Sequence, residues 1–181
     1  AYILDHSGTR VLFVDTEFLE TAYKAIQISK MQIKVILIKD KFFQDIKSSR
    51  ELDYEKFISS NDMKELDSNP NNEWDTISIN YTSGTTGNPK GVLYHYRGAY
   101  LNAVGNALEW DMNIHPVYLW TLPMFHCNGW CFPWTIAAKA GTNVCLRKVE
   151  GTSVYKAIKK HKVDHMCGAP IILNLVVEAF A

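Results

Sequence analysis

The segment 81–91, with the sequence YTSGTTGNPKG, constrains this chain more than any other stretch. Its glycines allow positive φ angles and a close backbone approach, so that several N–H groups can point at one anion. Its serine and threonine hydroxyls add donors, and Lys90 adds a positive charge on a flexible stem. Alternating apolar and polar residues over 77–81 predict a strand immediately before it. A strand that leads into such a loop is typical of a polyphosphate-binding site.

The loop differs from a Walker A motif, in which Ser or Thr follows the Gly-Lys pair. Here Gly91 follows Lys90, and Pro89 precedes it and limits the mobility of the loop. The alternative interpretation is a surface turn rich in glycine and threonine that binds no ligand. The predicted strand before the loop and the Pro-Lys-Gly sequence at its end favour the phosphate-binding interpretation.

The composition is that of a soluble globular protein and argues against two classes of partner. Hydrophobic residues make up 47% of the 181 residues and charged residues 21%, which suits one domain with a sizeable core. Because 19 basic residues balance 19 acidic ones, no nucleic acid or anionic membrane is expected as a partner. No apolar run has the length of a transmembrane segment. Without a signal peptide at the start, a cytoplasmic location is predicted, and the start at Ala1 instead of Met indicates an excised fragment.

Four cysteines, Cys127, Cys131, Cys145 and Cys167, lie among apolar residues in the sequence. This pattern predicts small buried thiols in a reducing compartment. Cys127 and Cys131 are four positions apart and His126 is adjacent, so a zinc site is an alternative. Two thiols and one imidazole without a fourth nearby ligand make a weak zinc site, so no metal ligand is predicted.

Short apolar runs, typical of strands, alternate along most of the chain with segments whose apolar residues recur at helical spacing. This alternation predicts an α/β fold with a mostly parallel sheet flanked by helices. Strands are expected over 10–15, 34–38, 77–81, 92–94, 117–122, 143–146 and 163–167. Helices are expected over 16–30, 53–58, 98–110, 132–139, 152–161 and from Pro170 onward. Thr16 is the expected N-cap of the first long helix, and Gly141 is expected to end the helix over 132–139. The polar stretch 39–74 is predicted to be a solvated excursion and linker.

Three motifs resemble those of the AMP-forming adenylating superfamily, which includes acyl-CoA synthetases, peptide-synthetase adenylation domains and firefly luciferase. The first is YTSGTTGNPKG over 81–91, the second is LPMFHCNG over 122–129, and the third is the Gly-Ala-Pro turn at 168–170. The strings LWTLPMFHCNGW at 119–130 and VCLRK at 144–148 are similar to the branch with medium-chain fatty-acyl-CoA and methylmercaptopropionate-type CoA ligases. The resemblance extends over nearly the whole chain.

The resemblance implies which residues act and on what. It implies that ATP, Mg²⁺ and coenzyme A take part, with a small carboxylic acid as substrate. It implies catalytic roles for Lys90 and His126, with His126 beside the carboxylate and the acyl-adenylate. The implied contacts to the β- and γ-phosphates come from Thr82, Ser83, Gly84, Thr85, Thr86, Gly87 and Lys90.

The resemblance also implies what residues 1–181 lack. They correspond to part of the large N-terminal domain, without the later Tyr-Gly-x-Thr-Glu motif and without the C-terminal domain with its catalytic lysine. The acidic partner of Mg²⁺ would then lie outside this chain. We therefore expect a piece of a fatty-acid–CoA ligase that is inactive alone. A homo-oligomer is compatible with the sequence. The alternative is a non-catalytic nucleotide- or acyl-binding module with the same fold, and a third possibility is a piece that binds nothing tightly.

Some residues keep two interpretations. Members of the superfamily often have a His before an Arg shortly after the loop, whereas Tyr96 precedes Arg97 here, so no role is carried to Tyr96 or His95. On sequence alone a histidine such as His126 is more often a hydrogen-bonded core residue. Three aromatic residues could line an acyl pocket or pack in the core with equal ease: Trp130, Phe132 and Trp134.

Overall fold

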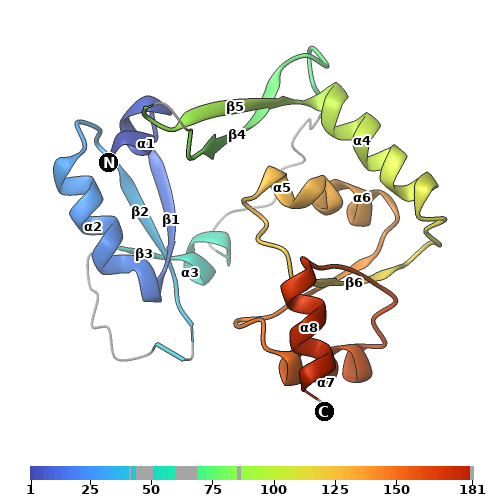
Figure 1. Cartoon of the computed structure of the whole chain (residues 1–181). Helices are drawn as coiled ribbons and strands as arrows, with labels where there is room; N and C mark the ends of the chain where they lie inside the picture. Colours follow the sequence, from blue (N-terminus) through green and yellow to red (C-terminus); the bar gives the residue numbers. More distant parts are fainter. Residues whose placement is uncertain (41, 44–50, 60–68, 85–86, 180–181) are drawn as a thin grey trace. The chain divides into compact units, whose positions relative to one another are not determined.

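The structure, a computed structural model, describes residues 1–40, 42–43, 51–59, 69–84 and 87–179 (Figure 1). The chain divides into two compact units, each of which is described by itself. The first unit comprises residues 1–69 and 83–91, and the second comprises residues 70–82 and 92–181. Each unit contains a three-stranded parallel sheet with helices, so the predicted α/β class is confirmed.

The first unit is built on a parallel sheet of order β1-β2-β3. Its elements are α1 (Tyr2–His6), β1 (Val11–Asp15), a 3-10 turn (Thr16–Phe18), α2 (Leu19–Ile28), β2 (Lys34–Ile38), β3 (Leu52–Asp53) and α3 (Tyr54–Ser59). Val14 lies opposite Leu37 in the β1–β2 pair, and both pack with Leu19 and Ala22 of α2. The predicted strand–helix–strand unit is therefore confirmed, with the helix crossing over between parallel strands.

The entry to α2 differs from the prediction because Asp15, and not Thr16, supplies the cap. The carboxylate of Asp15 accepts a hydrogen bond from the N–H of Glu17 at 2.9 Å and opens the 3-10 turn. Thr16 is buried, and its hydroxyl donates to the carbonyl of Ile38 at 3.0 Å. This bond joins the ends of the two paired strands, which is a use of threonine that helix periodicity does not indicate.

The polar stretch 39–74 is more structured than expected where it is described. Leu52–Asp53 adds a third parallel strand to the sheet, which was not predicted. The helix α3 confirms the one expected over 53–58, and Asp53 pairs with Lys39 at 2.8 Å. Residues 41, 44–50 and 60–68 lie outside the described residues.

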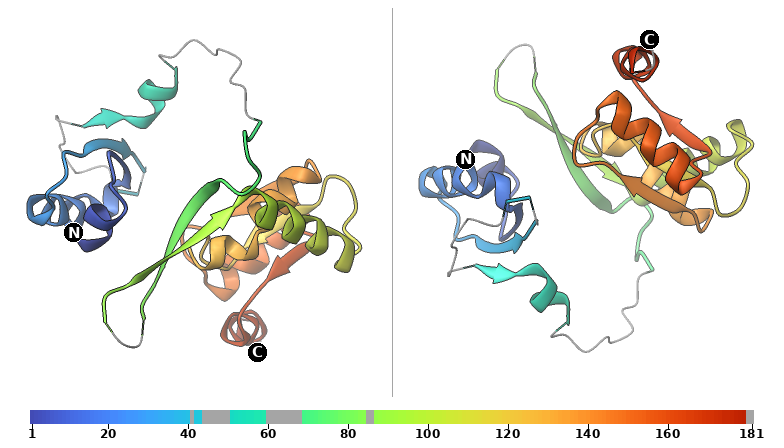
Figure 2. Two further views of the ribbon diagram at one scale, coloured as in Figure 1. Left: turned by 90° about the horizontal axis from the view of Figure 1, so that it is seen from above. Right: turned by 90° about the horizontal axis from the view of Figure 1, so that it is seen from below.

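The second unit begins with a two-stranded sheet and contains most of the helices. Its elements are β4 (Thr76–Thr82), β5 (Lys90–His95), α4 (Tyr96–Glu109), β6 (Val117–Trp120), α5 (Cys127–Trp130), α6 (Phe132–Ala138), β7 (Thr142–Cys145), α7 (Gly151–His161), β8 (His165–Cys167) and α8 (Pro170–Glu178). The connection between β4 and β5 is too short for a parallel crossover, so the two strands form a hairpin. Figure 2 shows β5 running directly into α4.

The parallel sheet of the second unit has the order β7-β6-β8, with β6 in the middle. Both faces of β6 are buried, because successive side chains of a strand point to opposite sides. Tyr118 stacks on Phe132 of α6 with ring centroids 4.8 Å apart, whereas Leu119 packs with Val154 of α7 on the other face. This continuous apolar strand explains why the sequence over 117–120 predicts a buried strand so clearly.

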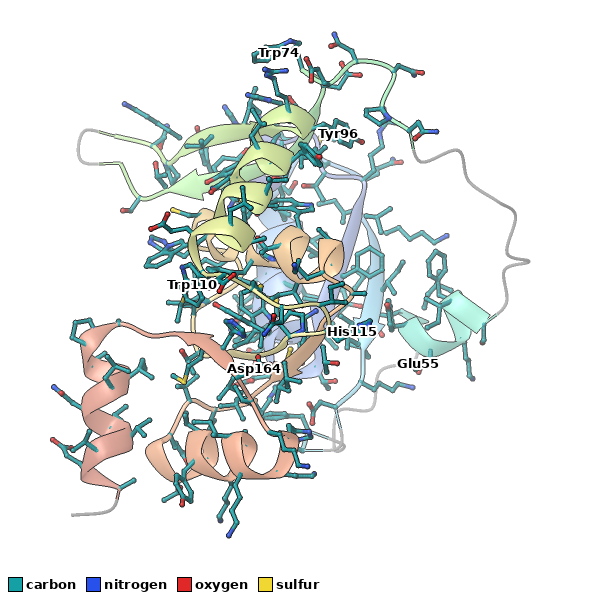
Figure 3. The ribbon with its side chains drawn as sticks, turned by 90° about the vertical axis from the view of Figure 1, so that its right-hand side faces the viewer. Glu55, Trp74, Tyr96, Trp110, His115 and Asp164 are labelled. Atoms are coloured by element: carbon teal, nitrogen blue, oxygen red, sulfur yellow. The ribbon has the colours of Figure 1, made fainter. Side chains whose placement is uncertain are left out.

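Helix α4 begins two residues earlier than predicted because His95 caps it. The Nδ1 atom of His95 accepts a hydrogen bond from the N–H of Gly98 at 3.0 Å. The ring of Trp74 lies 4.8 Å from that imidazole, and the Arg97 guanidinium lies 5.7 Å from the Trp74 ring. Figure 3 shows Trp74 and Tyr96 together at this end of the helix. His95 therefore has a structural role at the start of α4.

The end of α6 uses glycine for a reason other than the one predicted. The residue with positive φ after the helix is Ala140, with φ 49°, and not Gly141. A Cβ on Gly141 would lie 2.7 Å from the carbonyl oxygen of Pro116. Glycine is therefore required here by the close approach of the chain before β6.

Two of the four cysteines are buried as predicted, and the other two are exposed. Cys131 and Cys167 are buried, but Cys127 and Cys145 are exposed. Burial is the largest cause that raises the pKa of the Cys131 and Cys167 thiols, so both stay protonated at neutral pH.

Gly151 generates a stability prediction, because a Cβ there would lie 2.0 Å from the carbonyl oxygen of Leu175 on α8. We expect Gly151→Ala to lower the free energy of unfolding by about 1–3 kcal/mol through overpacking. Gly105→Ala in α4 is the matched control, since no atom lies within 4 Å of its added Cβ. That change should stabilise by roughly 0.5–1 kcal/mol. Urea unfolding of both variants measures the difference, and equal midpoints would contradict the close packing of α7 on α8.

Candidate functional site

The glycine-rich loop forms the tip of the β4–β5 hairpin, and two of its glycines have backbone angles that other residues avoid. Gly84 has φ +52° and Gly87 has φ +146°. Among the described residues, no atom lies closer than 3.4 Å to a Cβ built on Gly84, and none lies within 4 Å of a Cβ built on Gly87. Conformation, and not crowding, therefore requires glycine at both positions. Thr85 and Thr86 lie outside the described residues.

The polar groups that flank the loop face solvent. Thr82 is the last residue of β4, and both Thr82 and Ser83 are exposed. Lys90 is exposed at the first position of β5, and it forms no ion pair with the residues that the structure describes. The predicted strand before the loop is confirmed, and a second strand follows at once. Lys90 is held by that strand at its backbone while its ammonium group stays available to an anion.

His126 belongs to the second unit, whereas residues 83–91 belong to the first, so each is described within its own unit. It follows β6 and Pro123, and its N–H donates to the carbonyl of Pro123 at 3.1 Å. His126 is exposed, as are the neighbouring side chains of Met124 and Phe125. The alternative of a buried core histidine is therefore wrong.

The backbone after His126 makes a left-handed turn over residues 127–131. The five residues from Cys127 to Cys131 have φ angles between +48° and +64°. The segment α5 is therefore a left-handed turn, closed by hydrogen bonds from Gly129 N to His126 O and from Cys131 N to Asn128 O. L-residues other than glycine lose about 1–2 kcal/mol each in this conformation, and they adopt it as single residues more often than in a run. Neighbouring elements must stabilise the turn.

The strand β4 holds this turn by two side-chain hydrogen bonds. The amide nitrogen of Asn80 donates to the carbonyl of Phe125 at 3.1 Å, immediately before His126. The amide nitrogen of Asn128 donates to the hydroxyl of Ser78 at 2.7 Å, just after His126. Ser78 and Asn80 are two residues apart and therefore lie on one face of the strand.

Helix α4 and strand β6 hold the other end of the turn. Asn106 donates to the carbonyl of Trp130 at 2.9 Å, and Asn102 donates to the sulfur of Cys131 at 3.3 Å. A Cβ on Gly129 would lie 2.5 Å from a ring carbon of Trp120. The turn is thus fixed by asparagine side chains on two elements and by a tryptophan ring beneath it.

The groups beside the turn stay neutral. Burial raises the pKa of Tyr94, and Cys127 and Cys131 raise it further. The pKa of Cys131 is also raised, mainly by burial. Neither the Tyr94 phenol nor the Cys131 thiol therefore adds a negative charge to this region at neutral pH.

An apolar pocket of about 490 Å³ lies between β4, α4 and α6. Ile77 lines it from β4, and Trp134 lines it from α6. Because Ile77 and Ser78 are neighbours in a strand, the pocket and the left-handed turn lie on opposite faces of β4. The pocket is therefore not a direct continuation of the surface that carries His126.

The three aromatic residues with two interpretations have separate locations. Phe132 is buried in the core against Tyr118. Trp134 lines the apolar pocket. Trp130 is 50% exposed and belongs to the same turn as Cys127, next to His126. Of the three, Trp130 is the one whose location suits contact with a ligand at His126.

Sequence reasoning missed the residues that hold the turn, namely Ser78, Asn80, Asn102, Asn106 and Asn128. Two signals were available in the sequence. Asn128-Gly129 is a dipeptide that favours positive φ. Ser78 and Asn80 occupy polar positions of the alternating strand, so their side chains share one face and can bond to a common partner.

The described residues fit a phosphate better than a metal ion. The loop 81–91 contains hydroxyls, glycines and one amine, and no carboxylate. Within the described parts of the chain, no three His, Cys, Asp or Glu side chains gather in a group that could hold a metal. Mg²⁺ prefers carboxylate and phosphate oxygens. These residues alone therefore do not form a magnesium site.

Two curated plant proteins are similar to this chain over almost all of its length. The peroxisomal acetate/butyrate–CoA ligase AAE7 of Arabidopsis thaliana is 43% identical over 99% of this chain and 34% of its own length. The peroxisomal trans-cinnamate:CoA ligase of Petunia hybrida is also 43% identical, over 99% of this chain and 34% of its own. The chain thus spans about a third of the length of these relatives.

A solved structure shows the fold of this chain, and a family description shows the family. The luciferase-like enzyme of the mealworm Zophobas morio has the same fold, with a TM-score of 0.79 and 20% identity over 99% of this chain and 40% of that one. The family described as AMP-binding enzyme matches residues 1–181. This chain belongs to the AMP-binding enzyme family.

Proposed function

We propose that residues 1–181 are part of the N-terminal domain of an AMP-forming acid–CoA ligase. The observation that carries the proposal is the hairpin tip, with glycines at positive φ at positions 84 and 87 and an exposed Lys90 directly after it. Such a tip can turn backbone N–H groups toward one anion. The proposed anion is the triphosphate of ATP. The family match over the whole chain supports this choice over other phosphates.

In the first proposed half-reaction, a carboxylate oxygen of the acid attacks the α-phosphorus of ATP. The bond between the α-phosphorus and the bridging oxygen breaks, and pyrophosphate leaves with that electron pair. The ammonium of Lys90 and the N–H groups near Gly84 and Gly87 stabilise the negative charge of the β- and γ-phosphates. Further hydrogen bonds to these phosphates come from the hydroxyls of Thr82, Ser83, Thr85 and Thr86. Such groups contribute most when they stabilise the charge on the departing group.

In the second proposed half-reaction, the thiolate of coenzyme A attacks the acyl carbon, and AMP leaves. His126 is proposed to lie beside the carboxylate and the acyl-adenylate, where its ring can donate a hydrogen bond to a carboxyl oxygen. The exposure of its side chain supports this role. No step of this mechanism is assigned to Mg²⁺, whose carboxylate ligands we propose lie outside residues 1–181.

The proposed substrate is a small carboxylic acid with an apolar tail, and a fatty acid of medium length is the working choice. Met124, Phe125 and Trp130 expose apolar surface around His126. The names of the relatives specify acetate, butyrate and trans-cinnamate for those proteins. Acetate, butyrate, octanoate and trans-cinnamate therefore form the first substrate panel.

The compartment of the complete protein is part of the proposal. The sequence-based expectation is the cytoplasm, whereas both relatives are named as peroxisomal. No helix among the described residues combines the length and apolar character that a bilayer crossing requires. Fluorescence microscopy of the tagged complete protein decides between the two compartments.

The role of Lys90 is tested by Lys90→Ala in the complete protein. We expect acid-dependent ATP–pyrophosphate exchange to fall by about 100-fold or more, because the positive charge that stabilises the departing pyrophosphate is lost. The melting temperature should change little, since Lys90 is exposed. Lys156→Ala, at an exposed position of α7, is the matched control and should keep normal exchange. Unchanged exchange in Lys90→Ala, or a loss of exchange that only follows unfolding, would contradict the role.

The acyl contact is tested by comparing Trp130→Ala with Trp134→Ala. We expect Trp130→Ala to raise the KM for octanoate by roughly tenfold, because about 1–3 kcal/mol of apolar contact is removed. The KM for ATP should stay within twofold. Trp134→Ala should leave the octanoate KM unchanged, since Trp134 faces the pocket on the other side of β4. The opposite ranking of the two variants would assign the acid to the apolar pocket instead.

The incompleteness of the site is tested with residues 1–181 as a separate polypeptide. We expect this polypeptide to form no acyl-CoA with any acid of the panel, because the proposed ribose, adenine and metal contacts lie elsewhere in the complete protein. The complete protein, assayed at the same molar concentration, is the positive control. Thioester formation by the separate polypeptide would overturn this expectation.

A further inference from the structure

We propose that Ser78, Asn80 and Asn128 form a hydrogen-bonded clip that positions His126 for acyl-adenylate formation. The β4 clip, as these three residues are called here, consists of the Asn80–Phe125 and Asn128–Ser78 hydrogen bonds. The inference rests on the proposed function for the role of His126. It adds three positioning residues that touch neither ATP nor the acid.

The clip holds both sides of His126. Phe125, whose carbonyl accepts from Asn80, is the residue before it, and Asn128 is two residues after it. Two same-face residues of a strand are about 6.6–6.8 Å apart, so β4 presents two anchor points to one turn. The backbone of His126 is therefore fixed at both ends, while its ring remains exposed.

The turn needs such support because its conformation is unfavourable by itself. Four of its five residues, namely Cys127, Asn128, Trp130 and Cys131, are not glycine and still have positive φ. Without the bond to Ser78, the backbone around Asn128 can relax toward right-handed angles. That change would redirect the chain directly after His126, and the imidazole would move with it.

The clip joins this turn to the strand that precedes the phosphate loop. Asn80 lies two residues before Thr82, the last residue of β4. A small displacement of a positioned group can reduce a rate by about 100-fold without changing ligand affinity. We therefore expect loss of the clip to lower kcat and to leave the KM for ATP unchanged.

The test uses three variants of the complete protein, assayed by acid-dependent ATP–pyrophosphate exchange. Ser78→Ala removes the acceptor of the Asn128–Ser78 bond without substituting a residue of the turn. Asn128→Gly removes the donor and still permits positive φ. We expect each to lower kcat by about tenfold or more, with the KM for ATP within twofold of wild type. The double variant should be no slower than either single variant, because both remove the same bond.

Two further variants separate positioning from general stability. Ser78→Thr keeps a hydroxyl at the same position and should restore kcat to within about threefold of wild type. Asn174→Ala, at an exposed position of α8, removes an asparagine amide elsewhere and should leave kcat unchanged. Wild-type kcat in Ser78→Ala, or an additive loss in the double variant, would overturn the proposal.

A readout without catalysis distinguishes failure of the clip from failure of the proposed function. The amides of Gly129 and Cys131 donate hydrogen bonds inside the turn. In Ser78→Ala, hydrogen exchange of these amides should accelerate by about tenfold, whereas the amides of β6 should keep wild-type protection. If the wild-type protein shows no ATP–pyrophosphate exchange with any acid, the proposed function fails. The hydrogen-exchange data on the amides still test the clip in that case. Unchanged protection at Gly129 and Cys131 would overturn the clip itself.

Discussion

Positive backbone φ angles are the constraint on which both parts of the candidate site depend. Gly84 and Gly87 adopt them at the tip of the β4–β5 hairpin, and Cys127 to Cys131 adopt them after His126. In the loop, glycine makes the conformation inexpensive. In the turn, mostly non-glycine residues adopt it, so the surrounding structure must supply the difference in free energy. The two segments solve one geometric problem in two ways.

The support for the turn comes from amide side chains and not from apolar packing alone. Asn80 on β4 and Asn106 on α4 each donate to a backbone carbonyl of the segment, at 3.1 Å and 2.9 Å. A carbonyl whose amide donor is removed must find water or remain unsatisfied, which costs more than the net value of the bond. Hydrogen bonds from rigid strands and helices therefore define a conformation that the local sequence would not choose.

The fold was predictable from sequence where local pattern and tertiary packing agree. The strands β1, β2 and β6 and the helices α4, α6 and α7 appear within a few residues of their expected bounds, because apolar periodicity is a strong local signal of secondary structure. The predictions were wrong where a single side-chain hydrogen bond decides the role of a residue. Thr16 bonds to Ile38 and does not cap a helix, and His95 caps α4 although no role was expected for it.

The candidate site was predictable in its composition but not in its geometry. The glycines, Lys90 and His126 could be chosen from motif and chemistry. The hydrogen bonds that hold the left-handed turn could not, because each of them joins residues more than 20 positions apart. The predicted burial of Cys127 was wrong for the same reason, since the turn that exposes it is fixed by β4, α4 and Trp120.

The contact of Gly129 with the Trp120 ring separates what can vary in this region from what cannot. Trp120 is held in the middle strand of the sheet, and its indole N–H donates to Asn143 at 2.8 Å, so the ring has little room to withdraw. Any larger residue at 129 would have to displace the Trp120 ring. By contrast, the side chains of Met124, Phe125 and Trp130 are exposed. Substitutions at these exposed positions can therefore change the surface near His126, while the path of the main chain stays as it is.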